Sequence, residues 1–181
     1  MSTTEIVTFA PAGTWTVDPV HSTVGFEIGY MAGTFRGTFR DLSARLTVEG
    51  DSARLEGTAR VASVDVKDEN LSAHLQSPEF FDAERHPELR FSADEIRVDG
   101  ERVAVPGQIT IRGVTHPVEV AGTVAAPLVD PYGNDRIGLN LTAALDRTAF
   151  GLNWNNPLPS GEPALSNDVT IVADLQFVRG A

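Results

Sequence analysis

Long stretches of this chain alternate between apolar and polar residues, and this two-residue period constrains the fold more than any other feature. In residues 22–30, Phe26 and Ile28 fall in one set of alternate positions, whereas Glu27 falls in the other. Alternate side chains of a β-strand point to opposite faces of the sheet. Similar alternation recurs in residues 55–61, 103–111, 118–124, 137–145 and 169–177. We therefore predict an all-β chain whose strands each have one apolar face.

The apolar face of such a sheet has to be covered. Only residues 65–91 read clearly as helical, and one such segment is too small to cover a flat sheet of this size. Closing the sheet on itself buries the apolar face and also removes exposed strand edges. We expect a closed antiparallel β-barrel of about eight strands, with a short helical lid inserted near residues 68–86.

The lid is predicted from signals for the start of a helix. Asp68 is a favourable N-cap residue, and Leu71 and Leu75 then lie one helical turn apart. Ser77 followed by Pro78 repeats the start signal, because proline is tolerated in the first helical turn. We expect this helical segment to lie over one end of the barrel.

Two further features are candidates for covering the mouth of the barrel. Phe80 and Phe81 are adjacent, so we expect only one of them to point at the surface beneath the lid. Residues 148–167 form a long connection that has no helical pattern and contains Trp154. Loops of this length are usually functional or mobile.

A change of phase occurs within residues 34–48. Phe35 and Phe39 share one phase of the alternation, whereas Leu42 and Leu46 share the other. A β-bulge shifts the phase in this way and also bends the strand. We interpret this stretch as one long strand that contains a bulge.

Many residues of the inward rows are small, and this leaves two readings open. Barrels of about eight strands are either filled by their own side chains or wide enough to hold one small ligand. Interleaved small and large side chains would fill a tapered barrel, whereas the same small residues could leave a tunnel with aliphatic walls. The small inward residues are Gly57, Ala59, Ala93, Gly107, Gly122, Ala143 and Ala173.

The length of 181 residues suits a single domain, for which we expect a flexible N-terminus in residues 1–12 and the barrel in residues 13–181. No apolar run approaches the ~18 residues of a membrane helix, so we expect no integral membrane segment. The first residues lack the basic start and apolar block of a signal peptide, and the expected location is therefore cytoplasmic.

Composition excludes several classes of chemistry. The chain has no cysteine, which rules out disulfides, thiol catalysis and zinc–thiolate sites. Its net charge of −11 argues against nucleic acid and anionic membrane surfaces as partners, because both require basic patches.

The four histidines do not form a metal-binding pattern. His21, His74, His86 and His116 show neither a HExxH spacing nor a His-x-His pair, so we predict no metal site. His21 and His116 are expected to hydrogen-bond to backbone at strand ends. His74 lies on the proposed lid, where it either meets the head of a ligand or faces solvent.

Signals for catalysis are absent from the sequence. The 25 acidic residues fall almost entirely in turns or on outward phases, and no two of them face one cavity as a catalytic acid–base pair requires. There is no Gly-x-Ser-x-Gly, phosphate-binding glycine loop or dinucleotide fingerprint. Arg147, after an inward-facing strand, either pairs with a phosphate or carbonyl or forms a salt bridge with a turn carboxylate. We predict no catalytic residues and no enzymatic activity.

Several phrases of the sequence, in order along almost the whole chain, resemble the YceI-like family of bacterial lipid-binding proteins. They are WTVDPVHS at residues 15–22, GTFRG at 33–37, HLQSPEFFD at 74–82, GQITIRGVTHPV at 107–118 and DRTAFGL at 146–152. The resemblance implies a lipocalin-like antiparallel barrel around an elongated apolar pore that holds a polyisoprenoid or similar lipid. One departure is Leu71-Ser72, where the family usually has Arg-Asp on the lid helix.

Alternation and resemblance together predict the residues that contact this ligand. The leading hypothesis is a protein that binds and sequesters or carries an apolar isoprenoid lipid, either a polyprenyl chain or an isoprenoid quinone, with no other cofactor. The alternatives are a small-barrel enzyme that acts on a lipid-like substrate with His74 as base, and a packed-barrel interaction protein that could form a homodimer. The predicted ligand-binding residues are Phe26, Ile28, Phe35, Phe39, Ala59, His74, Leu75, Phe80, Phe81, Phe91, Ile109, Val120, Leu141, Ala143, Trp154 and Ile171.

Overall fold

The structure is a computed structural model that describes residues 10–50 and 52–180. In these ranges the first half of the chain forms β1 (Gly13–Val17), β2 (Thr23–Tyr30), β3 (Gly33–Phe39), β4 (Leu42–Glu49), β5 (Ser52–Arg60), the 3₁₀ helix η1 (Val61–Ser63), β6 (Val64–Asp65) and α1 (Glu69–Gln76). The second half forms β7 (Glu88–Ala93), β8 (Arg97–Asp99), β9 (Arg102–Ile111), β10 (Val114–Val129), β11 (Asp135–Asp146), the 3₁₀ helix η2 (Arg147–Phe150) and β12 (Leu165–Arg179).

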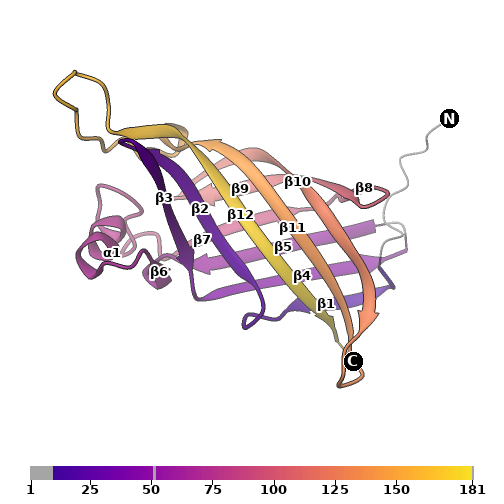
Figure 1. The fold of residues 1–181 in the computed structure, drawn as a ribbon. Coiled ribbons are helices and arrows are strands. Elements are labelled where there is room, and N and C mark those ends of the chain that lie inside the picture. Colours follow the sequence, from indigo (N-terminus) through magenta and orange to yellow (C-terminus); the bar gives the residue numbers. More distant parts are fainter. Residues whose placement is uncertain (1–9, 51, 181) are drawn as a thin grey trace.

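The strands form a closed antiparallel barrel, as the alternation predicts (Figure 1). Hydrogen bonds run around the ring in the order β1-β4-β5-β7-β9-β10-β11-β12, and β12 pairs again with β1. Trp15 of β1 closes the ring, because it lies opposite Leu46 of β4 on one side and opposite Arg179 of β12 on the other. The prediction of an all-β barrel of about eight strands is confirmed.

Three further strands extend the wall toward the end of the barrel that carries α1. β2 pairs with the first part of β12, β3 pairs with β2, and Phe39 at the end of β3 pairs with Val64 of β6. The hairpin β2–β3 therefore continues the wall where β1 has ended. Figure 1 shows α1 and the connection between η2 and β12 at this end, and the C-terminus at the other.

The prediction of one long, bulged strand over residues 34–48 is wrong. The chain forms two strands, with a turn at Arg40 and Asp41. At this turn the backbone N–H of Arg40 donates to Ser63 O (3.1 Å), and that of Arg60 donates to Asp41 O (2.9 Å). The phase changes because β3 and β4 pair with different strands, β3 with β2 and β6, and β4 with β1 and β5.

The helical insertion is shorter than its sequence signals predict. Asp68 caps α1 as expected, since its carboxylate accepts a hydrogen bond from the backbone N–H of Leu71 (2.9 Å). Ser77 ends α1 and does not begin a second helix, and residues 77–85 form a series of turns. Asp82 adopts a left-handed backbone with φ 51°, and the N–H of His86 donates to its carbonyl (2.8 Å). A run of helical dihedrals cannot pass through such a residue.

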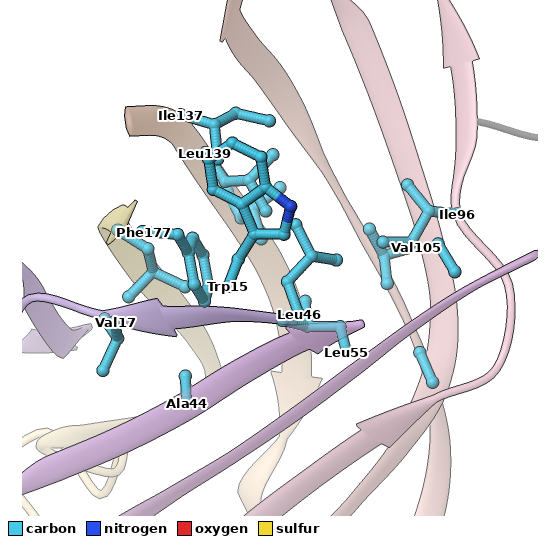
Figure 2. Close-up of a cluster of buried hydrophobic side chains, with 14 of the residues drawn as sticks. Trp15, Val17, Ala44, Leu46, Leu55, Ile96, Val105, Ile137, Leu139 and Phe177 are labelled. Carbon is cyan, nitrogen blue, oxygen red and sulfur yellow. The ribbon is translucent and has the colours of Figure 1, made fainter. Parts of the chain in front are cut away.

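One end of the barrel is filled by its own side chains. Trp15, Leu46 and Phe177 are completely buried there, with Ile96 and Val105 against them (Figure 2). The indole N–H of Trp15 donates to the carbonyl of Pro11 (3.1 Å), so the polar atom of this ring is also satisfied. These five residues belong to a larger group that we call the Trp15 cluster. Its other buried members are Val17, Leu42, Ala44, Val48, Ala53, Leu55, Ala93, Val103, Ile137, Leu139, Leu141 and Leu175.

The N-terminal prediction falls largely on residues 1–9, which lie outside the described residues. From residue 10 onward the chain contacts the barrel: Ala10 packs against the Trp15 cluster, and Arg179 Nη2 donates to Ala12 O (2.6 Å). Within the described ranges, α1 is too short and too polar to cross a bilayer, and neither 3₁₀ helix is longer.

Candidate ligand-binding cavity

The other end of the barrel is hollow. A cavity of about 340 Å³ with almost entirely apolar walls lies between the Trp15 cluster and the covering segments. Ligand sites commonly have volumes of roughly 300–1,000 Å³. Its floor is formed by Leu55, Leu141 and Leu175, which also belong to the Trp15 cluster. The barrel is therefore filled by its own side chains at the Trp15 cluster and hollow at the other end, so each of the two readings of the small inward residues applies to one part of it.

Every residue predicted to bind a ligand lines this cavity. Ten contribute to the strand walls: Phe26 and Ile28 of β2, Phe35 and Phe39 of β3, Ala59 of β5, Phe91 of β7, Ile109 of β9, Val120 of β10, and Leu141 and Ala143 of β11. Ile171 of β12 completes the wall, and His74, Leu75, Phe80, Phe81 and Trp154 belong to the covering segments. Their contact with a ligand remains a prediction.

The small residues of the inward rows have two different roles. A Cβ at Gly107 would lie 2.7 Å from the ring of Phe91, and one at Gly37 would lie 2.6 Å from the ring of Phe26. These glycines make room for aromatic rings of the neighbouring strands. At Gly57, by contrast, a Cβ would meet no atom closer than 3.6 Å. A Cβ there would make only ordinary van der Waals contacts, and Gly57 itself lines the cavity.

The cover consists of two segments that contact each other. The His74 ring of α1 packs edge to face on Trp154 of the connection between η2 and β12, with centroids 5.1 Å apart. Phe80 contacts both rings, at 4.9 Å from His74 and 5.3 Å from Trp154. Phe81 packs on Phe39 of β3 (5.9 Å). The expectation that only one of the two phenylalanines faces inward is wrong, because in a turn both can reach the cavity.

The sequence leaves open whether His74 faces a ligand or solvent, and in the structure it borders both. Its ring forms part of the cavity wall, while Nε2 lies 2.7 Å from the carboxylate of Glu79 on the outer side. The side chain is about one third exposed, at 34%. Its polar atom is thus paired with a protein group.

Arg147 is a cavity residue that the site prediction omitted. It follows β11, and only 4% of it is exposed. Nε donates to the carbonyl of Ser166 (2.8 Å) and Nη1 to that of Leu152 (2.5 Å), whereas Nη2 has no hydrogen-bond partner among the described residues. Burial lowers the pKa of this guanidinium, but arginine remains charged in proteins.

Other lining residues were also missing from the prediction. Leu145 and Val169 share the inward phase of residues already chosen, so the alternation itself could have identified them. Phe150 and Leu152 belong to a segment without regular alternation, and no local signal marks them as inward. Leu71, at the departure from the family pattern, lines the cavity too.

The acidic residues with strongly shifted pKa values lie outside the cavity wall. A hydrogen bond from His21 and another from Arg136 lower the pKa of Asp18 to about 2. Arg136 also lowers the pKa of Asp130 to about 2. Across the described residues there is no group of three or more His, Cys, Asp or Glu side chains placed to hold a metal ion.

A closed antiparallel barrel with one packed end, a hollow apolar end and a cover over the hollow end defines a lipocalin-like barrel with a lumen. The sequence model described as YceI-like domain matches residues 15–177. The chain belongs to the YceI-like family.

Curated relatives carry the family name UPF0312. A UPF0312 protein of Photorhabdus laumondii is 29% identical over 134 residues, which cover 72% of this chain and 70% of that protein. A UPF0312 protein of Pseudomonas putida is 36% identical over 110 residues, which cover 56% of each chain. The chain thus spans little more than half the length of the second relative.

Solved structures share the fold at low sequence identity. Burkholderia cenocepacia BcnA has a TM-score of 0.75 at 24% identity, over 88% of this chain and 98% of BcnA. A Campylobacter jejuni YceI protein has a TM-score of 0.71 at 22% identity, over 83% of this chain and 88% of that one. A polyisoprenoid binding domain from Saccharophagus degradans has a TM-score of 0.67 at 15% identity, over 92% of this chain and 98% of that domain.

Proposed function

We propose that this protein binds an apolar isoprenoid lipid, either a polyprenyl chain or an isoprenoid quinone, in the barrel cavity and sequesters or carries it. The observation that carries the proposal is the apolar cavity of about 340 Å³ beneath a two-part cover. The YceI-like family and the fold shared with the polyisoprenoid binding domain of Saccharophagus degradans support lipid binding in general. The choice of lipid is part of the proposal.

Removal of the hydrocarbon chain of the lipid from water supplies the binding energy. Each buried methylene is worth roughly 0.8 kcal/mol, so about ten buried carbons give a gross ~8 kcal/mol before the costs of binding. The net free energy of binding is smaller than this gross figure, because association and ordering of the ligand have their own cost. The almost entirely apolar walls therefore provide most of the affinity through the hydrocarbon part of the ligand.

A binding protein fits the cavity better than an enzyme does. Of the ionisable residues in its wall, Glu56 and Arg90 have side chains that are mostly exposed on the outer face, at 51% and 69%. His74 is paired with Glu79, and no carboxylate faces Arg147 across the cavity among the described residues. Catalysis by a general acid and base needs two such groups facing one substrate.

The test is the lipid content of the purified protein. We expect a long-chain apolar lipid to co-purify in stoichiometric amount, and mass spectrometry of a solvent extract would identify it. Delipidated protein should then bind an added prenyl quinone, observed through quenching of Trp154 fluorescence. Extracts without lipid from several expression hosts, together with no quinone binding, would contradict the proposal.

A further inference from the structure

Arg147 is held rigidly at the end of the cavity that lies under the cover. Its Nε is bonded to the carbonyl of Ser166 at the start of β12, and its Nη1 to that of Leu152 in the connection before β12. Two bonds from one planar guanidinium to two separate segments fix the plane of the group. The position of Nη2 is thereby fixed as well.

Among the described residues Arg147 forms no salt bridge, although the Asp146 carboxylate is near enough to raise the pKa of its guanidinium slightly against the effect of burial. The adjacent carboxylate, Asp146, accepts hydrogen bonds from the backbone N–H (2.9 Å) and the hydroxyl (2.6 Å) of Thr148. Of the two alternatives left open for Arg147, pairing with carbonyls is observed and the salt bridge with a turn carboxylate does not form. Both partners that Arg147 does have are neutral carbonyls.

A buried donor without an acceptor is costly, and a buried charge without a partner is more so. Arg147 nevertheless lines an otherwise apolar cavity, with 4% of its surface exposed and two N–H groups on Nη2 unused. A hydrocarbon in the cavity would leave these groups unsatisfied. A ligand with an oxygen atom at this point would satisfy them.

We propose that Arg147 Nη2 binds an oxygen acceptor on the head group of the lipid, and that Arg147 thereby sets the direction in which the lipid enters. This inference rests on the proposed lipid-binding function and specifies the class of ligand. The acceptor is a carbonyl oxygen, as in a quinone or ester, or an acid oxygen, as in a carboxylate or phosphate. Both satisfy the same donor, but an oxyanion must also be desolvated.

The placement of Arg147 fixes the orientation of the chain. Arg147 lies just after β11, near the cover, whereas Leu55, Leu141 and Leu175 form the floor next to the Trp15 cluster. The head group therefore lies under the segment of residues 151–164, and the hydrocarbon tail points toward the packed end. A lipid in the opposite direction would place methyl groups against Nη2.

The test compares three probes with the same branched twenty-carbon skeleton: the alkane phytane, methyl phytanate and phytanic acid. Their affinities for delipidated protein are measured at neutral pH. Hydrogen bonds to charged groups are strong enough to change affinity roughly 10- to 100-fold. We expect one or both oxygenated probes to bind more tightly than phytane by such a factor. Tighter binding of the ester indicates a neutral carbonyl acceptor, whereas tighter binding of the acid indicates an oxyanion.

Arg147→Met removes the donor and should abolish this preference, leaving phytane affinity within about threefold of the wild-type value. Arg112→Met is the matched control, because Arg112 also donates to a carbonyl of this segment, Gly151 O (3.0 Å), but does not line the cavity. It should retain the preference. If Arg147→Met does not fold, the guanidinium NMR signals of Arg147 in the wild-type protein should shift with an oxygenated probe and not with phytane.

The outcomes separate the two proposals. Equal binding of all three probes, or a preference that survives Arg147→Met, overturns the role of Arg147 and leaves lipid binding intact. If the guanidinium NMR signals of Arg147 do not shift when an oxygenated probe binds, the role of Arg147 is likewise overturned and lipid binding is left intact. Binding of none of the three probes overturns the inference, and the proposed function falls as well if prenyl quinone also fails to bind.

Discussion

Ala143 and Thr142 are neighbours on β11 that lie on opposite sides of the barrel wall. Both residues contribute to the cavity wall, but Ala143 is only 7% exposed and shares the inward phase of Leu141, whereas Thr142 is exposed and has the outward phase. A phenyl ring added at residue 143 would therefore occupy the space that we assign to the ligand. In a fully packed interior the same change would cost about 1–3 kcal/mol through overpacking.

We predict that Ala143→Phe lowers prenyl-quinone affinity at least about tenfold and changes the stability of the ligand-free protein by less than about 1 kcal/mol. Thr142→Phe adds the same ring to the outer face and should leave affinity unchanged. Chemical denaturation and a binding titration of both variants provide the measurement. Strong destabilisation by Ala143→Phe, or normal binding by it, would refute an open cavity at this position.

At the scale of elements, an ion-pair cluster joins the β1–β2 turn to the β10–β11 hairpin. Arg136 of β11 donates to Asp18 (2.9 Å) and to Asp130 (2.7 Å). Both carboxyl groups have a pKa of about 2 in the folded protein, below the ordinary value of 3.8. A carboxyl group whose pKa is lowered by folding stabilises the protein above its unfolded-state pKa, and this contribution disappears as the pH falls toward the folded-state pKa.

We therefore predict that Arg136→Met reduces the loss of stability between about pH 4 and pH 2, because the two carboxyl groups then titrate closer to 3.8. The pKa of Asp18 should rise less than that of Asp130, since Asp18 keeps its hydrogen bond to His21. NMR titration of the carboxyl carbons and acid denaturation would measure both effects. Arg97→Met, which breaks the surface pair with Glu95, is the control and should alter neither titration.

Trp154 joins the two covering segments, because its ring contacts both His74 and Phe80. Aromatic pairs contribute about 0.5–1.5 kcal/mol each beyond area burial, so loss of both contacts favours opening by roughly 1–3 kcal/mol. We predict that Trp154→Ala increases the rate of ligand release about 5- to 150-fold in stopped-flow displacement. Trp154→Phe retains an aromatic ring, so its rate of ligand release should lie between the rates of the wild-type protein and Trp154→Ala. An unchanged release rate would mean that the lipid leaves by another route.

How much the sequence predicts depends on whether an element is determined locally or by distant partners. Alternation identified the inward side chains of β2, β9 and β11, because the direction of a side chain in a strand depends on its own backbone. The turn at Arg40 and Asp41 was missed, because it depends on bonds to Ser63 and Arg60 across the sheet. The partners of Arg147 are likewise carbonyls 5 and 19 residues away.

At the scale of the whole molecule, stability and binding are assigned to opposite ends of one barrel. The Trp15 cluster closes the ring of strands with completely buried side chains, among them Leu46 and Phe177. The other end encloses the cavity beneath the two covering segments. The two ends share the floor residues Leu55, Leu141 and Leu175, so a change made away from this floor should affect mainly one of the two properties.

Leu46→Ala tests this division at the packed end, because Leu46 is completely buried in the Trp15 cluster and does not line the cavity. We predict a loss of about 2–5 kcal/mol in the free energy of unfolding, as for other buried leucines, with prenyl-quinone affinity within about twofold of the wild-type value. Since the stabilisation by a ligand depends only on its concentration and affinity, saturating quinone should stabilise Leu46→Ala by as many kcal/mol as it does the wild-type protein. The same quinone should stabilise Ala143→Phe much less. Denaturant titrations of the wild-type protein and both variants, with and without quinone, measure the free energies of unfolding and the stabilisation by quinone. A large loss of quinone affinity in Leu46→Ala would show that the packed end also shapes the cavity.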